Sequence, residues 1–203
     1  MDAKCKICRR AGEKLFLKGE RCFSPKCAIA RKPYAPGMHG KKRGKRLSEF
    51  GAQLKEKQKM REMYGLREKQ FRNYAESAIR QKTHSGKKLI ELLESRLDSV
   101  FSRAFAMPRK ISRQIVSHGH VLVNGRKVNI SSYSVKAGDV VKIRPQSANK
   151  GVFANLDTVL QKYNPPAWLS LDKSKKECKV LNRPVNEADL GINVNSIIEY
   201  YSR

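Results

Sequence analysis

Four of the five cysteines lie near the start of the sequence, and their spacing could bind a metal ion. They are Cys5, Cys8, Cys22 and Cys27, in the pattern C-x2-C-x13-C-x4-C. Two close pairs of thiolates joined by a loop can close a tetrahedral site of the structural zinc type. We therefore expect a zinc ion, with an iron–sulfur cluster as the first alternative and four unrelated reduced thiols as the second. Four thiolate ligands leave no open coordination position, so this metal would be structural.

A second group of residues, between positions 109 and 127, has the composition of a phosphate-binding site. Ser112 is a good N-cap for a short helix, and Gly119 suits the left-handed residue that ends one. Asn124-Gly125 is the strongest short hairpin signal, because a type I′ turn needs positive φ at both central residues. The cations around these features are Arg109, Lys110, Arg113, Arg126 and Lys127. Since helix starts attract anions, we expect these cations to bind phosphate, the alternative being solvated surface charges.

Residues 31–46, RKPYAPGMHGKKRGKR, form a third candidate site. Two prolines and three glycines exclude a helix or a central strand from this segment. Its cations could follow a phosphate backbone, while Tyr34 and His39 could stack on bases or sugars. We interpret the segment as a basic arm that becomes ordered on binding RNA, the alternative being a flexible tail.

These regions supply the candidate RNA-binding side chains. From the arm they are Arg31, Lys32, Tyr34, His39, Lys41, Lys42, Arg43, Lys45 and Arg46. From the region around the hairpin they are Arg103, Arg109, Lys110, Ser112, Arg113, Gln114, His118, His120, Asn124, Gly125, Arg126 and Lys127. We interpret His118 and His120 as RNA contacts or as packing residues between helix and strand.

The overall charge also indicates a polyanionic partner. The 203 residues include 44 Lys and Arg against 18 Asp and Glu, a formal net charge of +26. Residues 1–46 carry 15 of these cations and 3 of the acids, whereas residues 145–203 carry 8 and 6. Such an excess repels itself unless a polyanion neutralises it, so we expect a polyanion to contact mainly the N-terminal three-quarters of the chain. The alternative is a generally basic, soluble surface.

Other classes of protein fit the sequence less well. No apolar run approaches the ~20 residues of a membrane span, and the first residues lack the apolar stretch of a secretory signal. No paired carboxylates, nucleophile–base set or phosphate-cradling glycine loop is present, so we expect neither an enzyme nor a small-molecule substrate. A metal-finger DNA-binding regulator is disfavoured because the positive charge is not concentrated on one recognition helix.

The hydrophobic pattern predicts a helical region followed by short strands. Helices are expected at 48–64, 66–82 and 85–105, with Phe50 and Leu54 on the inner face of the first. Strands are expected at 120–123, 126–130, 140–144, 168–171 and 179–181, with Val128 and Ile130 on the apolar face of the second. Residues 145–164 are expected to be a linker with a helical centre, and 187–190 a short helical piece. Cys178 is expected to be an ordinary strand residue.

Several motifs together resemble the ribosomal protein S4 family of the small subunit. Arg96-Leu-Asp98, residues 112–125, Ser132-Tyr133 and Gly138-Asp139 resemble its RNA-binding module, which also occurs in several RNA enzymes. Outside the module no room remains for a catalytic domain. Residues 31–40, 48–59, 64–65, 69–72, 168–169 and 200–203 resemble the other parts of the bacterial-type protein. The resemblance therefore covers essentially the whole chain.

The resemblance implies an α+β fold with three parts. Residues 1–46 would form the four-cysteine metal knuckle and the basic Pro/Gly arm. Residues 47–90 plus 182–203 would form a helical domain, interrupted by an α/β domain at 91–181. That inserted domain would pack helices on a mainly antiparallel sheet and would contain the RNA-binding module at about 94–144.

The resemblance also implies a function. It implies a primary binding protein for 16S ribosomal RNA that nucleates assembly of the small (30S) subunit, contributes to translational accuracy and lies near the messenger RNA entry path. The implied partners are neighbouring small-subunit proteins, with protein five among them, and messenger RNA, and the implied location is the ribosome in the cytoplasm. Members without the four cysteines exist, so the metal site rests here on Cys5, Cys8, Cys22 and Cys27 being present.

Overall fold

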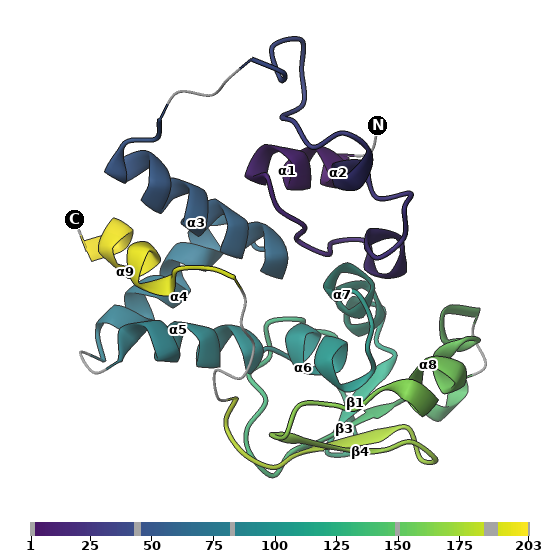
Figure 1. Cartoon of the computed structure of the whole chain (residues 1–203). Coiled ribbons are helices and arrows are strands. Elements are labelled where there is room, and N and C mark those ends of the chain that lie inside the picture. Colours follow the sequence, from purple (N-terminus) through teal and green to yellow (C-terminus); the bar gives the residue numbers. More distant parts are fainter. Residues whose placement is uncertain (1–2, 43–45, 82–83, 149–150, 185–190, 203) are drawn as a thin grey trace. The chain divides into compact units, whose positions relative to one another are not determined.

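The chain folds into two compact units, shown in Figure 1. The computed structural model describes residues 3–42, 46–81, 84–148, 151–184 and 191–202. One unit is built from residues 1–86 and 189–203, and the other from residues 87–188. The chain therefore leaves the first unit, forms the second, and returns to complete the first.

The N-terminal segment consists of short helices joined by turns. These are α1 (Ala3–Ala11), the 3-10 helix η1 (Gly19–Cys22) and α2 (Ala28–Arg31). Arg9 of α1 is buried and donates hydrogen bonds from Nε to the carbonyl oxygens of Lys32 (3.0 Å) and Tyr34 (2.8 Å). A third bond, from Nη2, reaches the carbonyl oxygen of Ala35 at 3.3 Å. One guanidinium group thus fixes the start of the arm to the first helix.

The rest of the first unit is helical. It contains α3 (Glu49–Tyr64), α4 (Glu68–Ile79), the start of α5 (Ser85–Glu94) and α9 (Val194–Ser202), and α9 packs against α3 and α4. Ser48 caps α3 by accepting a hydrogen bond from the Gly51 N–H, and Gly65 ends it in the left-handed conformation. The core includes Met60, Tyr64, Phe71 and Ile197.

One expectation for α3 is wrong. Phe50 was predicted on the inner face but is exposed, and its ring contacts Tyr200 of α9. The buried side chains of α3 are Gln53, Lys57 and Lys59, together with Met60 and Tyr64. The two lysines can be buried because carboxylates pair with them: Glu68 with Lys57, and Glu13 and Glu56 with Lys59.

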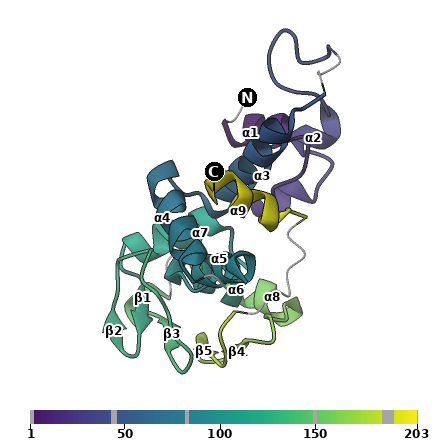
Figure 2. The same ribbon diagram turned by 90° about the vertical axis from the view of Figure 1, so that its left-hand side faces the viewer.

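The second unit packs helices on a five-stranded antiparallel sheet (Figure 2). The helices are α6 (Leu97–Ala104), α7 (Arg109–Ser117) and α8 (Leu156–Lys162), with short 3-10 turns η2 (Pro145–Ser147) and η3 (Gly151–Phe153). The strands are β1 (Val121–Val123), β2 (Arg126–Lys127), β3 (Val140–Ile143), β4 (Leu169–Asp172) and β5 (Glu177–Val180), in the order β2-β1-β3-β5-β4. This confirms the predicted mixture of helices with a mainly antiparallel sheet.

The core of this unit lies between the sheet and its helices. Val123, Val141 and Cys178 are aligned across β1, β3 and β5, and all three are buried. Cys178 is therefore a strand residue, as predicted. The segment 145–164, predicted to be a linker, does have a helical centre, but it also contributes Phe153, Leu156 and Leu160 to the core. Ile130, expected on an apolar face, lies beyond the end of β2 and is exposed.

The single helix predicted at 85–105 is wrong, because the chain forms two helices there. α5 ends at Glu94 and α6 begins at Leu97, with Arg96 extended between them. The Leu97 N–H donates to the Tyr133 carbonyl at 2.8 Å, and Arg96 forms an isolated antiparallel bridge with Ser134. These bonds to a distant loop interrupt an apolar pattern that would otherwise continue as one helix.

The short helical piece predicted at 187–190 lies outside the described residues. Within the described ranges, none of the helices has both the length and the apolar character that crossing a membrane requires.

Candidate nucleic-acid interface and cysteine pocket

Helix α7 begins one turn earlier than the sequence indicated. Pro108 stands at its N-cap position with φ −57°, and the first helical residue is Arg109. Ser112 is therefore inside the helix, where its hydroxyl donates to the Pro108 carbonyl. The predictions of Ser112 as the N-cap and as an RNA contact are both wrong, because the side chain is fully buried (0% exposed). Arg109 and Lys110 consequently occupy the first turn of the helix.

Two buried carboxylates hold the arginines around this helix start. The Glu94 side chain is 6% exposed and accepts hydrogen bonds from Arg103 (3.0 and 3.1 Å) and Arg109 (2.9 Å). The Asp98 side chain is 4% exposed and accepts hydrogen bonds from Arg96 and Arg113. Arg96 is itself buried, whereas Arg103, Arg109 and Arg113 remain partly exposed. Three of the predicted RNA-binding cations, Arg103, Arg109 and Arg113, are thus oriented by buried carboxylates.

The hairpin forms as predicted. Asn124 (φ 49°) and Gly125 (φ 79°) both adopt positive φ, and β1 pairs with β2 in an antiparallel register. The Asn124 side chain, however, bonds within the protein: its Nδ2 donates to Asp139 Oδ1, and its Oδ1 accepts from the Val140 N–H. Asn124 therefore fixes the turn, and the exposed β2 side chains, Arg126 and Lys127, are left to face a partner.

Lys127 lies beside the C-terminal end of α7. Gly119 ends the helix with φ 71°, and a Cβ added there would lie 2.2 Å from Lys127 Cε. The absence of a side chain at Gly119 therefore lets the side chain of Lys127 cross the C-terminal end of α7. Arg109 and Lys110 stand about 13 Å away at the other end of this nine-residue helix. Lys127 therefore lies at one end of α7, and Arg109 and Lys110 lie at the other.

The remaining residues predicted on this surface differ in exposure. Lys110, Gln114 and His118 are exposed on α7. His120 is half-buried, and its Nδ1 lies 2.9 Å from the hydroxyl of Ser147. The two histidine rings are 6.0 Å apart, edge to face. His120 thus packs between helix and strand, and His118 is exposed; an RNA contact of either residue stays a prediction.

The structure describes residues 31–42 of the arm, and its ordering on RNA binding stays a prediction. Gly37 adopts φ 111°, and a Cβ at Gly40 would lie 1.9 Å from the Ala35 carbonyl oxygen, so the backbone turns back on itself between these residues. The half-buried Tyr34 ring lies between two cations, with Arg9 4.7 Å and Lys41 5.7 Å from its centroid. The predicted residues Arg31, Lys32, His39, Lys41, Lys42 and Arg46 are exposed. Arg43 and Lys45 lie outside the described residues.

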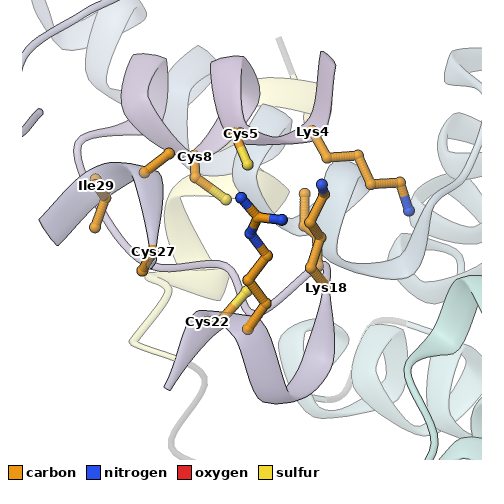
Figure 3. A pocket seen from close by; sticks show the side chains of 10 residues that line it. Lys4, Cys5, Cys8, Lys18, Cys22, Cys27 and Ile29 are labelled. Carbon is orange, nitrogen blue, oxygen red and sulfur yellow. The ribbon is translucent and has the colours of Figure 1, made fainter. Parts of the chain in front are cut away.

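The four N-terminal cysteines line one pocket (Figure 3). Cys5 and Cys8 belong to α1, Cys22 ends η1, and Cys27 directly precedes α2. All four are free thiols, and Cys22 and Cys27 are buried. Lys18 and Arg21 line the same pocket. The structure thus brings together the four residues that the sequence spacing grouped.

The electrostatic surroundings differ among these thiols. Burial raises the pKa of the Cys8 thiol above its usual value, and the charges of the three other cysteines raise it further. Burial also acts to raise the pKa of Cys27, but hydrogen bonds from the backbone N–H groups of Ile29 and Ala30 lower it to below its usual value. Among the described residues, no group of three or more His, Cys, Asp or Glu side chains has an arrangement that could hold a metal ion. The zinc site therefore stays a prediction.

Sequence reasoning missed three features of these sites. It did not assign a role to Glu94 or Asp98, because nothing in a sequence distinguishes a buried carboxylate from a solvated one. It also missed the anchoring of the arm by Arg9. The third feature is a pair of exposed rings, Phe16 and Phe23, within the cysteine segment. The sequence signal that could have indicated this pair is the presence of two phenylalanines in a segment rich in lysine and arginine.

Comparison with known families and proteins is consistent along the whole chain. Residues 1–94 match the family described as "Ribosomal protein S4/S9 N-terminal domain", and residues 95–141 match the "S4 domain". A small ribosomal subunit protein uS4 from Syntrophomonas wolfei is 47% identical over 204 aligned residues, covering 100% of this chain and 98% of the relative. Proteins of the same name from Kosmotoga olearia and Thermus thermophilus are each 48% identical, covering 98% of this chain and 96% of the relative. The chain therefore belongs to the family of small ribosomal subunit protein uS4.

Proposed function

We propose that this protein is a structural component of the small ribosomal subunit that binds 16S ribosomal RNA. The observation that carries the proposal is the match to uS4 proteins over the full length of the chain. The family is structural and not enzymatic, in agreement with the absence of a catalytic set from the sequence. The +26 net charge requires a polyanionic partner, and ribosomal RNA supplies one.

The charged surface of the second unit suits RNA phosphate. The first turn of α7 presents Arg109 and Lys110 where the backbone N–H groups of the helix start also favour an anion. At the other end of the helix, Arg126 and Lys127 are exposed on β2. A phosphate backbone that followed α7 would meet cations at both ends, with the exposed Gln114 and His118 between them.

The family resemblance supports a more specific role. In this proposal the protein binds early, nucleates assembly of the small subunit in the cytoplasm, and contributes to translational accuracy near the messenger RNA entry path. Small-subunit protein five and messenger RNA would be its further contacts.

A binding assay with matched variants tests the RNA proposal. The full chain should bind 16S ribosomal RNA more tightly than unrelated RNA or duplex DNA. Lys110→Ala combined with Arg126→Ala should weaken that binding and lower the slope of log affinity against log salt by ~0.7–0.9 per lost contact. Lys175→Ala combined with Lys179→Ala removes the same charge from exposed positions around β5 and should change the affinity little. Equal binding of all RNAs, or equal effects of the two double variants, would contradict the proposal.

We also propose that Cys5, Cys8, Cys22 and Cys27 bind one zinc ion. The supporting observation is that all four line a single pocket as free thiols. Thiolates are suitable ligands for zinc, and the segment is too short to bury a sizeable core by itself. The metal would hold this segment together and would have no part in a reaction.

Elemental analysis of protein purified anaerobically and without chelator tests the metal proposal. About one zinc per chain is expected. Visible absorbance typical of an iron–sulfur cluster would assign the site to the alternative cofactor, and the absence of both metals would contradict the proposal. Cys22→Ser should lower the metal content, whereas Cys178→Ser should not, because Cys178 is buried in the sheet.

A further inference from the structure

Two phenylalanine rings form an exposed stack in the N-terminal segment. The centroids of Phe16 and Phe23 are 4.9 Å apart, and the rings are inclined by 29°. Phe16 is 45% exposed and Phe23 is 75% exposed, so the pair is largely accessible to solvent. Water contact is unfavourable for two large apolar rings, and a stack in this position is a feature that requires an explanation.

Buried neighbours hold this pair in place. Leu15, which precedes Phe16, is buried, and so is Cys22, which precedes Phe23. The chain thus buries one residue and turns the next outward at each of the two positions. The two rings therefore project from a segment whose neighbouring residues are packed.

The backbone at Phe16 adopts an unusual conformation. Its φ is 50°, in the left-handed region that bulky residues rarely adopt. Glycine would take this conformation freely, yet the position holds an aromatic residue whose ring remains 45% exposed. Core packing therefore does not account for the strain. A strained residue that displays its side chain is a typical functional position.

The surroundings of the pair are basic. Lys14, Arg21 and Lys26 are exposed in the same short segment, before, between and after the two rings. An apolar protein partner would have to desolvate these cations, whereas RNA would place its phosphates on them. Unpaired bases stack on aromatic rings, and the neighbouring phosphates require cations within a few ångströms.

From these observations we propose that Phe16 and Phe23 form a stacking platform for an unpaired base of RNA, with Phe23 as the outer ring. The platform is a second RNA contact in addition to α7 and the hairpin, and it rests on the proposed function. Its ligand class is a single-stranded or bulged nucleotide, not a duplex, because bases in a duplex are already stacked on each other.

Variants at Phe23 separate stacking from general apolar contact. Phe23→Ala should weaken binding of the full chain to 16S ribosomal RNA by roughly 5-fold to 100-fold, the range found for loss of one base–aromatic stack. Phe23→Tyr should retain the affinity because it keeps the ring. Phe23→Leu should behave like Phe23→Ala, since it is apolar but has no aromatic face. Wild-type affinity in Phe23→Leu would overturn the proposal and indicate an apolar contact instead.

The salt dependence gives an independent readout. Removal of a ring releases no counterion, so Phe23→Ala should weaken binding with an unchanged slope of log affinity against log salt. Lys26→Ala should lower that slope by ~0.7–0.9. A mixed-sequence single-stranded oligonucleotide should show the loss in Phe23→Ala, whereas the matched duplex should bind both proteins equally.

A second variant excludes misfolding as the cause. Phe16→Gly removes a ring at a position where glycine suits the backbone, so the thermal unfolding midpoint should not fall while RNA affinity does. Ultraviolet cross-linking of the unmodified chain to 16S ribosomal RNA should yield a cross-linked peptide that contains Phe16 or Phe23. If the wild-type chain prefers ribosomal RNA and the Phe variants bind it with wild-type affinity, the stacking platform is contradicted and the proposed function stands. If the wild-type chain shows no such preference, the proposed function itself fails.

Discussion

The region of α7 and the hairpin, residues 94–127, and the N-terminal segment, residues 3–42, both carry many cations but hold them differently. In the first region, the buried carboxylates of Glu94 and Asp98 orient four arginines: Arg96, Arg103, Arg109 and Arg113. In the N-terminal segment, Arg9 is anchored by backbone carbonyl oxygens, and most other cations are exposed. In the region of α7 and the hairpin, carboxylates thus fix the orientation of the arginines. In the N-terminal segment, most cations are exposed on a short packed segment.

The difference teaches how a very basic protein can present a defined surface. A carboxylate reduces the net charge, yet its bidentate geometry fixes the direction of a guanidinium group. Less conformational entropy is then lost when that group meets a phosphate. In the described part of the N-terminal segment, Arg9 is held by backbone carbonyl oxygens, and Glu13 pairs with Lys59 of α3. The order of this segment therefore needs a further source. In our proposal a zinc ion supplies it.

Metal removal should give the largest contrast between the two regions. Structural zinc typically contributes about 10–16 kcal/mol to the folding of a small domain. A chelator should therefore unfold residues 3–31 and leave the second unit folded. Trp168 is the only tryptophan in the sequence and is buried in the second unit, so its fluorescence should not change while helical circular dichroism decreases. A simultaneous loss of both signals would contradict the separate stabilisation of the regions.

The second largest contrast is expected in the reactivity of Cys178 compared with that of the four N-terminal cysteines. Burial raises the pKa of Cys178 to about 12, far above the ~8.5 of a free thiol. At pH 8 in chelator, its thiolate fraction should be roughly a thousand-fold below that of an ordinary cysteine, so alkylation should modify the four N-terminal cysteines first. Mass spectrometry of the alkylated peptides gives the order.

The same pKa predicts a pH dependence for the second unit. Because the folded-state pKa lies above the unfolded value, the protonated Cys178 thiol adds stability that is fully present below about pH 8.5. This contribution is lost as the pH rises from there towards 12. Cys178→Ala should remove this part of the alkaline destabilisation of the second unit, as measured by unfolding followed through Trp168 fluorescence. Early alkylation of Cys178 in the folded protein would contradict its assignment to the core.

Loss of a buried carboxylate should destabilise the second unit. Asp98→Ala leaves the buried guanidinium of Arg96 without its carboxylate partner and frees Arg113 from its support. Breaking a buried ion pair by removal of one partner typically costs about 3–5 kcal/mol. Denaturant unfolding followed by Trp168 fluorescence measures the effect. The control is Asp157→Ala, whose exposed pair with Lys176 should contribute about 1 kcal/mol or less.

Local features of the fold could be predicted where the chain needs a special conformation. Asn124-Gly125 and Gly119 gave the hairpin and the end of α7, because positive φ restricts the choice of residue. The break at Arg96 could not be predicted, since it depends on bonds from Leu97 and Asp98 to the distant loop at 131–133. The start of α7 was misplaced because Pro108, and not Ser112, occupies its N-cap position.

For the candidate sites, too, the sequence indicated groupings of residues that are close along the chain. The spacing of the cysteines grouped four residues that do line one pocket, because their separation along the chain is short. The support of Arg113 by Asp98 spans 15 residues and depends on the packing of α7 against α6. The sequence alone does not show this packing, so Arg113 was interpreted as a surface cation. Its replacement by alanine would affect both folding and binding, and for that reason Lys110 and Arg126 are better probes of the RNA surface.

The smallest expected effect concerns the anchor of the arm. Arg9→Lys keeps the charge but cannot reproduce the hydrogen bonds from one planar group to the carbonyl oxygens of Lys32, Tyr34 and Ala35. Hydrogen bonds from charged groups contribute about 1.5–3 kcal/mol, so the start of the arm should detach in a measurable fraction of molecules. Trypsin should then cleave after Lys41 and Lys42 faster than in the wild-type chain.

Arg10→Lys is the matched control, since Arg10 is the next residue of α1 and is exposed. It should leave the cleavage rate unchanged. Affinity for 16S ribosomal RNA should fall only a few-fold in Arg9→Lys, and the salt slope should stay the same, because no cation is lost. If Arg9→Lys and Arg10→Lys gave equal cleavage rates, the arm would not depend on Arg9. Its cations would then be as unsupported as the sequence alone suggested, and the contrast with the carboxylate-held arginines of α7 would become larger.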